Sequence, residues 1–373
     1  MSAFSQILRR TFSTASLKLF YKEKDISKLV QSFKDNTQNV VFRRKASYYE
    51  FVVQQLTRAK AFGLIEEILE DQKQYVEITN EGFAVRLISL YGKSGLFDRA
   101  RQLFDEMPEL KCVRTVKSFN ALLGACVSSK KFDKIEGFFR ELPGESGIKP
   151  DVVSYNTVIK GFCEMGSLDL ARSMLDEMEK DGICPDLITF NTLFDGFYKK
   201  GRFLDGEKFW DLMKKYNVVP DIISYNMRIH GLVLQDKIQE SIDLVDEIKN
   251  TGLDPDKFTF NLLFKGLCSD GKYIEEAKRQ YFDMVKANCE PDMATFVTLL
   301  PFACDNGDFM FAARLCRKLL RCRFRLKGVN VVQKVIDGLV KQSFVNEAEL
   351  LVKLGKESKH SCYHSLKIRT LGK

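Results

Sequence analysis

Histidine and proline are scarce in this sequence, and their scarcity narrows the kinds of protein it can encode. The 373 residues include three histidines, so few side chains are suited to acid–base or metal chemistry near neutral pH. Eight prolines in a chain of this length favour helices. No uncharged apolar run reaches the roughly 18 residues that a membrane-spanning helix needs. The richest stretch, residues 294–304, is much shorter.

Closely paired cysteines are also missing. The ten cysteines stand at wide, irregular intervals without a Cys-x-x-Cys, which favours reduced thiols used as small buried residues in an intracellular compartment. Against these absences, 45% apolar residues and 30 phenylalanines provide ample surface to bury, so wholesale disorder is excluded. A net charge of +8 permits a nucleic-acid partner without requiring one.

The few prolines mark an internal repeat. Five of them stand 35, 35, 35 and 36 residues apart, and aspartate follows each: Pro150–Asp151, Pro185–Asp186, Pro220–Asp221, Pro255–Asp256 and Pro291–Asp292. Five residues after the aspartate comes an asparagine preceded by an aromatic residue, at Asn156, Asn191, Asn226 and Asn261, and Val297 breaks the series. A period of about 35 residues indicates a solenoid rather than the two or three domains that length alone suggests.

One period, residues 152–186, predicts a helical hairpin. Apolar residues recur at helical spacing over 153–162 and again over 168–178, on either side of a break at Met165-Gly166-Ser167. Gly182 and Pro185 end the second helix, because glycine accepts a left-handed cap and proline cannot continue the hydrogen-bond ladder. A hairpin of this size cannot bury both apolar faces alone, so neighbouring hairpins must stack.

The same phase divides most of the chain into repeats. We expect units at 46–80, 81–115, 116–151, 152–186, 187–221, 222–256, 257–292 and 293–327, with a partial unit at 328–356. Residues 23–45 are expected to form an N-terminal capping segment. The outer units are atypical, with Glu50 and Val85 where the central ones carry asparagine, as terminal solenoid repeats often are.

Both ends of the chain are basic. Residues 1–22 contain no acid, and their arginines, lysines and serines interleave with apolar residues, which is typical of a mitochondrial transit peptide cut near residue 12. A retained amphipathic helix is the alternative. Residues 357–373 are expected to form a solvated basic tail. His360, Cys362 and His364 lie close together there but make a poor metal cage, because a fourth ligand is missing nearby.

The repeat units resemble a known family. Residues 152–163, VVSYNTVIKGFC, and 182–186, GICPD, closely resemble the pentatricopeptide repeat, and so do the units at 187–221, 222–256 and 257–292. The uniform unit length is similar to the P-type class of plant organelle proteins. The tetratricopeptide repeat is a poorer match, because its Trp, Gly and Tyr signature is missing. The resemblance implies an all-α fold, a right-handed superhelical solenoid of stacked helix-turn-helix hairpins.

The resemblance also implies a function, which is the binding of single-stranded RNA with one base per repeat. In this family the asparagine and the last residue of the same repeat read the base edge, and Asn with Asp favours uridine over cytidine. The implied reading pairs are Asn120/Asp151, Asn156/Asp186, Asn191/Asp221, Asn226/Asp256 and Asn261/Asp292. The implied base-sandwiching residues are Lys117, Val153, Ile188, Ile223 and Phe258.

Two features weigh on this reading. The family often carries a phosphate-binding basic residue on the first helix, and among the central units only Lys199 keeps it. The charge can be replaced by residues one helical turn beyond the asparagines, namely Lys160, His230 and Lys265. The asparagines have a simpler alternative role, which is to cap the first helix of each hairpin. The aromatic residues before them, and Trp210, are expected to pack in the core.

Signatures of catalysis are missing from the sequence. It has no zinc-deaminase motif, no phosphate-binding Gly-rich loop and no Gly-x-Ser-x-Gly, so we expect a binding protein without a cofactor or metal rather than an enzyme. The main expectation is a mitochondrial matrix protein that binds a pyrimidine-rich stretch of a transcript and acts in its stabilisation, processing or translation. The alternative is a structural or assembly component of the mitochondrial ribosome, in contact with rRNA and ribosomal proteins. A protein ligand in the groove is a third possibility.

Overall fold

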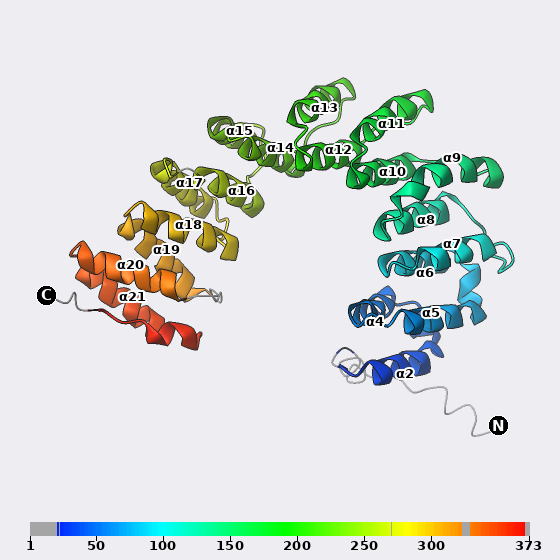
Figure 1. Cartoon of the computed structure of the whole chain (residues 1–373), viewed down its shortest axis with the longest axis horizontal. Coiled ribbons are helices and arrows are strands. Elements are labelled where there is room, and N and C mark those ends of the chain that lie inside the picture. The colour runs from blue at the N-terminus through cyan, green and yellow to red at the C-terminus, as the bar shows by residue number, and fades with distance from the viewer. Residues whose placement is uncertain (1–20, 22, 270, 323–328, 370–373) are drawn as a thin grey trace. The chain divides into compact units, whose positions relative to one another are not determined.

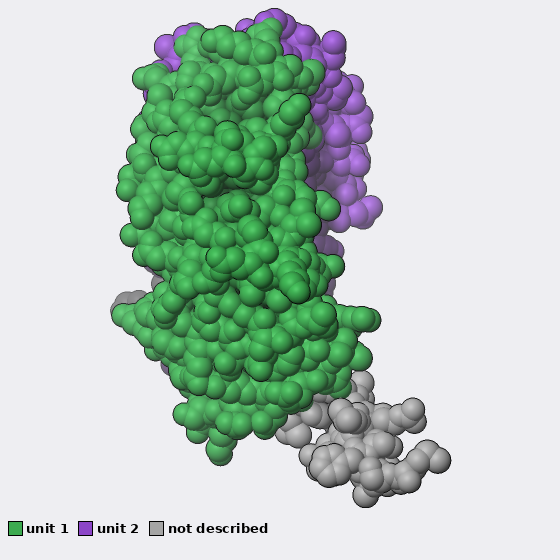
Figure 2. All heavy atoms as spheres, turned by 90° about the vertical axis from the view of Figure 1, so that its right-hand side faces the viewer, with its two compact units in different colours: residues 1–196 green, residues 197–373 purple. Residues whose placement is uncertain are grey.

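The computed structural model describes residues 21, 23–269, 271–322 and 329–369, and every regular element in these residues is a helix. The predicted transit peptide lies outside the described residues except for Tyr21. The chain divides into two compact units, residues 1–196 and 197–373, which are coloured separately in Figure 2 and are described here one by one. Among the described residues, no helix is long and apolar enough to cross a membrane.

Unit 1 is built of short helices that follow one another in pairs (Figure 1). It contains α2 (Ile26–Thr37), α3 (Val40–Arg43), α4 (Ala46–Arg58), α5 (Phe62–Glu70), the 3-10 turns η3 (Asp71–Gln74) and η4 (Val76–Thr79), α6 (Glu81–Lys93), α7 (Phe97–Glu106), α8 (Val116–Ser128), η5 (Phe132–Lys134), α9 (Ile135–Ser146), α10 (Val152–Met165) and α11 (Leu168–Lys180). The next helix, α12 (Leu187–Lys199), begins in unit 1 and ends in unit 2.

Unit 2 continues the same pattern. It contains α13 (Phe203–Lys215), α14 (Ile222–Leu234), α15 (Ile238–Asn250), α16 (Lys257–Leu267), α17 (Ile274–Lys286), α18 (Met293–Asp305), α19 (Phe309–Arg321), α20 (Asn330–Lys341), α21 (Val345–Glu357) and the 3-10 turn η6 (Ser361–Ser365). First helices of successive hairpins begin at residues 222, 257 and 293, which matches the period of about 35 residues. The expected all-α architecture of helical hairpins is therefore confirmed.

Five of the second helices, α9, α11, α13, α15 and α17, end in the same way, with a residue in the left-handed conformation. One or two residues beyond the helix, φ is positive at Gly147, Gly182, Asn217, Gly252 and Asn288. Glycine lacks the Cβ that disfavours this conformation and asparagine tolerates it better than most residues, so these two types end the helix and turn the chain toward the next hairpin. The role predicted for Gly182 is confirmed by its φ of +69°.

Aromatic and apolar residues of the first helices form the core. The aromatic residue before each asparagine is buried, as expected, at Phe119, Tyr155, Phe190, Tyr225 and Phe260. Trp210 is also buried and meets the Tyr225 ring edge-on at a centroid distance of 5.1 Å.

Glycines let the first helices of neighbouring hairpins approach closely. A Cβ added to Gly196 would lie 2.3 Å from the Cys163 sulfur, and one added to Gly231 would lie 3.0 Å from the Tyr198 ring. Such a Cβ would overlap its neighbours, so only glycine permits this packing.

The N-terminal end of unit 1 departs from the repeat pattern. In place of a Pro-Asp connection, η3 and η4 link α5 to α6, and buried Arg43 of α3 holds this link in place. Its guanidinium pairs with Glu77 at 3.0 Å and lies over the Tyr75 ring at 4.1 Å. The hydrogen bonds from Arg43 outweigh burial and hold the pKa of Glu77 below its ordinary value. The segment before the first hairpin is thus tied to it.

The C-terminal tail is not freely solvated, and that expectation is wrong for its described part. Tyr363 and Leu366 are buried, and both approach Gly355 of α21 closely. The lysines expected to make the tail soluble, Lys359 and Lys367, are exposed. Two apolar side chains among basic ones are enough to anchor the segment on α21.

Candidate nucleic-acid interface

The aspartates at the repeat boundaries cap the first helices. Asp151, Asp221, Asp256 and Asp292 are the N-cap residues of α10, α14, α16 and α18. Each forms a capping box with the serine or threonine three residues later, and Asp186 likewise accepts a hydrogen bond from the backbone N–H of Thr189 at 2.8 Å. The helix start is therefore encoded locally, by Asp-x-x-Ser or Asp-x-x-Thr.

The asparagines connect one hairpin to the cap of the next. In the hairpin of α10 and α11, the Asn156 amide donates to Asp186 Oδ1 at 3.0 Å, and its oxygen accepts from the Thr189 hydroxyl at 2.6 Å. The same pair of bonds recurs with donor–acceptor distances of 2.5–3.2 Å in the sets Asn120/Asp151/Ser154, Asn226/Asp256/Thr259 and Asn261/Asp292/Thr295. Four amide planes are thus held by two bonds each, in equivalent positions.

This geometry shows that the asparagines do not cap their own helices. Asn156 lies one full turn inside α10, which begins at Val152, and the N-cap is Asp151. The capping alternative was wrong because the asparagine and the aspartate are both good cap formers, and the sequence alone does not say which of them stands at the helix boundary.

Two of the carboxylates in these sets, those of Asp151 and Asp292, have a pKa below the ordinary value. Burial by itself raises the pKa of Asp151, but hydrogen bonds from the Asn120 amide and from Ser154 outweigh it and hold the pKa below its ordinary value. Burial likewise opposes ionisation of Asp292, whose pKa is lowered by the Thr295 N–H and the Asn261 amide. These two carboxylates are therefore charged acceptors for the amides of Asn120 and Asn261.

Each of these four amides keeps part of its hydrogen-bonding capacity. Asn156 and Asn226 are buried, with 8% and 3% of their surface exposed, whereas Asn120 and Asn261 are half-buried. A carboxamide has two N–H hydrogens, and each of these four donates one to its aspartate. Within the described residues we find no acceptor for the other. The oxygen likewise keeps a lone pair, so a planar donor–acceptor edge remains.

The expected base-sandwiching residues lie on the surface beside these amides. Val153, Ile188, Ile223 and Phe258 are exposed although they are large and apolar, and Lys117 is exposed too. They occupy the second position of their helices, two residues after the capping position. Exposed apolar side chains at a regular spacing can stack on flat ligands such as nucleobases.

The expected phosphate-binding lysines are surface residues. Lys160, Lys199 and Lys265 are exposed, and His230 is half-buried. The fifth reading pair, Asn191 and Asp221, has one member in each unit. The neighbouring Arg228 pairs with Glu207 at 2.7 Å and lies over Trp210, so this arginine supports the fold.

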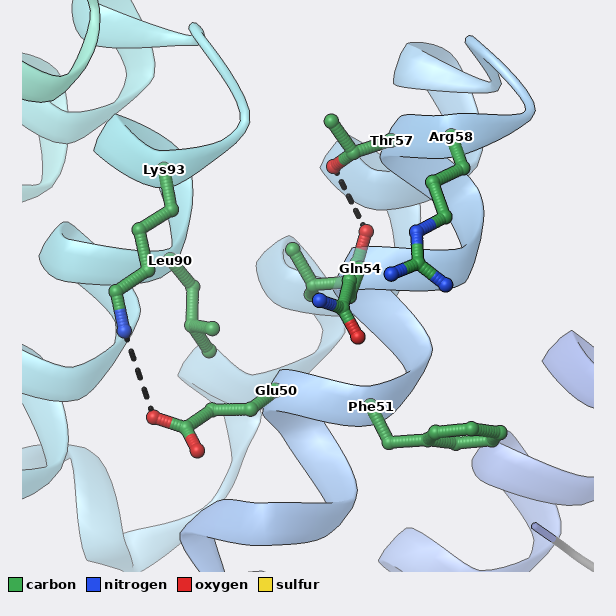
Figure 3. A pocket seen from close by; sticks show the side chains of 8 residues that line it. Glu50, Phe51, Gln54, Thr57, Arg58, Leu90 and Lys93 are labelled. Carbon is green, nitrogen blue, oxygen red and sulfur yellow. Dashed lines mark hydrogen bonds and ion pairs between the residues drawn. The ribbon is translucent and has the colours of Figure 1, made fainter. Parts of the chain in front are cut away.

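The first two hairpins carry a different set of groups. A cavity of about 560 Å³ lies between α4 and α6, and it is lined by Glu50, Phe51, Val53, Gln54, Thr57, Arg58, Leu90 and Lys93. Figure 3 shows Glu50 and Lys93 pointing toward each other from the two helices, with a distance of 3.5 Å between carboxylate and ammonium. Arg58 and Lys93 lie thirteen residues after the capping position, where Lys199 lies in its own repeat.

Glu81 replaces the asparagine–aspartate set at the second of these hairpins. Its carboxylate accepts hydrogen bonds from the Thr115 hydroxyl at 2.8 Å and from the Ser118 N–H at 3.2 Å, at the start of α8. These bonds outweigh burial and lower the pKa of Glu81. The sequence interpretation missed this residue, since Glu81 and Thr115 are far apart in the chain.

The interpretation also missed the hydroxyl residues Ser154, Thr189, Thr259 and Thr295, which fix the amide oxygens. Their signal was present, because a serine or threonine three residues after each aspartate is a capping-box pattern. Among the described residues, no group of three or more His, Cys, Asp or Glu side chains is arranged to hold a metal ion.

Two family models of known proteins match this chain. The model of the PPR repeat family matches residues 114–164, 150–199, 185–234 and 220–269, and that of the PPR repeat matches 86–112 and 258–289. Together they span more than half of the chain.

Two relatives from Arabidopsis thaliana are the small ribosomal subunit proteins mS79 (rPPR3b) and mS78 (rPPR3a). The first is 51% identical over 42% of this chain and 40% of its own length, and the second 42% identical over 48% and 52%. The matches thus span about half the length of these relatives. Among solved structures, the pentatricopeptide repeat protein PPR10 from maize has the same fold, with a TM-score of 0.51 and 20% identity over 97% of this chain and 52% of that one.

Proposed function

Because the chain belongs to the PPR, or pentatricopeptide, repeat family, we propose that it binds single-stranded RNA through its carboxamide series, defined as Asn120, Asn156, Asn191, Asn226 and Asn261. The observation that carries the proposal is the recurring hydrogen-bond set in which an amide is held by the aspartate and hydroxyl of the next hairpin. A fixed amide that keeps one N–H and one lone pair suits the edge of a pyrimidine.

The order of preference we propose is uridine, then cytidine, then the purines. The exposed apolar residue beside each amide supplies a stacking surface, and base stacking is worth about 1–3 kcal/mol per base. The lysines at 160, 199 and 265 are the candidates for contact with phosphate. The proposed activity is RNA binding without catalysis. The proposed location is the mitochondrial matrix, which the basic, acid-free residues 1–22 favour.

The test is binding of oligouridylate, followed by fluorescence anisotropy. The double variant Asn156→Val/Asn226→Val is expected to lose at least tenfold in affinity and its preference for uridine. The matched control is Thr189→Val/Thr259→Val, which removes the hydroxyls bound to the same amides but keeps the amides themselves. The control should lose stability and keep the base preference. Unchanged affinity in the asparagine variant would remove the proposal.

A second candidate function is a component of the mitochondrial ribosome. It is favoured by the names of the two relatives, both of which are small ribosomal subunit proteins. Sedimentation of organelle extracts separates the two candidates. If the protein still migrates with a ribosomal subunit after nuclease has trimmed free RNA, ribosome association is supported. If it migrates alone, transcript binding is favoured.

A further inference from the structure

The last hairpin carries a carboxamide that belongs to the series by position. In four of the five repeats with a reading pair, those of Asn156, Asn191, Asn226 and Asn261, the asparagine stands five residues before a glycine at which an added Cβ would meet a side chain of the preceding hairpin. In α20 the close-contact glycine is Gly338, where an added Cβ would lie 2.1 Å from the Phe309 ring. Gln333 stands five residues before Gly338. The repeat pattern was defined by asparagine at this position, so it did not include a glutamine.

Gln333 is already bonded to the chain's own C-terminal segment. Its Nε2 donates to the backbone oxygen of Lys367 at 2.7 Å, and the Lys367 N–H donates back to Gln333 Oε1 at 3.3 Å. A peptide group that offers one donor and one acceptor to an amide in this way resembles the edge of a pyrimidine. The partner residue lies 34 positions further along the chain, the same separation as between Asn261 and Thr295.

The donors of Gln333 are fully used. Its Nε2 donates a second hydrogen bond to Asp337 Oδ1 at 2.8 Å, so both N–H hydrogens are engaged. The asparagines at 120, 156, 226 and 261 each donate one. Gln333 therefore has no donor left for a base.

The segment that pairs with Gln333 is firmly attached to unit 2. Tyr363 is 0% exposed and Leu366 is 2% exposed, and an added Cβ at Gly355 would lie 2.7 Å from the Leu366 side chain. Beyond Lys367, Arg369 reaches Asp337 at 3.4 Å. Tyr363 and Leu366 therefore anchor the segment from one side, while Lys367 and Arg369 attach it to α20.

We propose that residues 366–369 end the RNA-reading series by occupying Gln333, so that the last hairpin binds the protein's own backbone in place of a nucleotide. The inference rests on the proposed function, because it concerns the length of RNA that the series reads. Removal of this segment would free the Gln333 amide and add one base-reading position to the series.

The first experiment needs no RNA. Hydrogen exchange, followed by mass spectrometry on a peptide that covers Lys367, is compared in the full chain and in Gln333→Ala. The variant should exchange the Lys367 N–H at least tenfold faster. The matched control is Gln342→Ala, another glutamine of this hairpin, which donates to the Gly307 backbone and does not touch the segment. Equal exchange in Gln333→Ala and the full chain would overturn the pairing whether or not the protein binds RNA.

The second experiment measures the length of RNA that is read. A chain ending at Leu366 keeps both buried anchors and loses the backbone that pairs with Gln333, and a chain ending at Arg369 is the matched control. With oligouridylates of increasing length, the chain ending at Leu366 should need one more nucleotide than the control to reach its maximal affinity. If both chains reach maximal affinity at the same oligouridylate length, or if the truncated chain binds more weakly, the proposal that the segment ends the series is overturned. Failure of every chain to bind oligouridylate would count against the proposed function and leave the exchange result standing.

Discussion

Asn156 and Asp186 lie thirty residues apart in the chain, yet the amide of the first donates to the carboxylate of the second at 3.0 Å. Asp186 in turn accepts from the backbone N–H of Thr189, at the start of the next hairpin. The same two side chains therefore join neighbouring hairpins and present an amide edge. The proposed base recognition uses the same side chains as the packing of the hairpins, so experiments on the asparagines must separate the two.

We predict that Asn156→Asp destabilises unit 1 more than Asn156→Ala does. Alanine removes the two hydrogen bonds of the Asn156 amide, and each such bond contributes about 0.5–1.5 kcal/mol, while Asp186 and Thr189 remain bonded to each other. Aspartate has the same shape but places a second carboxylate beside Asp186, and like charges at this distance repel. Urea unfolding at pH 7 measures both changes.

The control for this pair is Thr157→Ala. The Thr157 hydroxyl bonds only to the Val153 backbone within its own helix, at 2.7 Å, so its loss should change the free energy of unfolding by no more than about 0.5 kcal/mol. A result in which Asn156→Asp is as stable as the original chain at pH 7 would contradict the assigned contact.

We predict that acid destabilises the protein in part through Asp151 and Asp292. The pKa of each is below its ordinary value of 3.8 in the folded chain, so protonation favours the unfolded state. Their contribution is fully present above the ordinary pKa and is lost as the pH falls through the lower folded one. The variant Asp151→Asn/Asp292→Asn keeps good cap formers and removes the titration. Its free energy of unfolding, measured from pH 6 to pH 2.5, should fall less steeply than that of the original chain; an identical slope would refute the assignment.

We predict that a single methyl group at Gly196 is costly while one at Gly124 is not. Both glycines lie inside first helices, but an added Cβ at Gly196 would lie 2.3 Å from the Cys163 sulfur and one at Gly124 meets nothing within 4 Å. Gly196→Ala should therefore cost about 1–3 kcal/mol through overpacking. Gly124→Ala should stabilise by about 1 kcal/mol, because alanine is the better helix former. Thermal unfolding of the two variants gives the comparison, and equal melting temperatures would rule out the close contact.

We predict that Arg58 and Lys93, beside the cavity between α4 and α6, contribute phosphate contacts. Replacing both by glutamine should weaken RNA binding equally for all base compositions. It should also make the slope of log affinity against log salt shallower by about 1.4, since each contact with single-stranded RNA contributes about 0.7. Lys180→Gln, an exposed lysine of the second helix α11, is the control and should leave the slope unchanged. A variant with the original slope would show that this cavity does not meet the RNA backbone.

The repeat and its hairpins could be predicted because their signals are local. The capping aspartate, the helical spacing of apolar residues and Gly182 at the helix end all lie within one period, and the structure has each of them. The burial of Tyr155 and Phe260 follows from the same pattern. These features depend on backbone chemistry that neighbouring residues in the sequence decide.

The links between hairpins could not be predicted in the same way. The bonds from Asn156 to Asp186, from Thr115 to Glu81 and from Gln333 to Lys367 all join residues 30 or more positions apart. Their existence depends on how closely the helices stack, and that depends on the glycines. The tail was taken for solvated because Tyr363 and Leu366 are only two apolar residues in a basic segment, too few to form a periodic pattern.

The close contact between Gly196 and Cys163 bears on how such chains can be rearranged. Where a first helix carries such a glycine, the helix fits against a side chain of the preceding hairpin, so the glycine and that side chain form a matched joint. Exchanging one hairpin for another, in an engineered binder or by unequal crossing-over, would mismatch a joint at both of its borders. Transplanting two or more adjacent hairpins together keeps the contacts between them intact. A block of adjacent hairpins is therefore better suited to recombination than a single repeat.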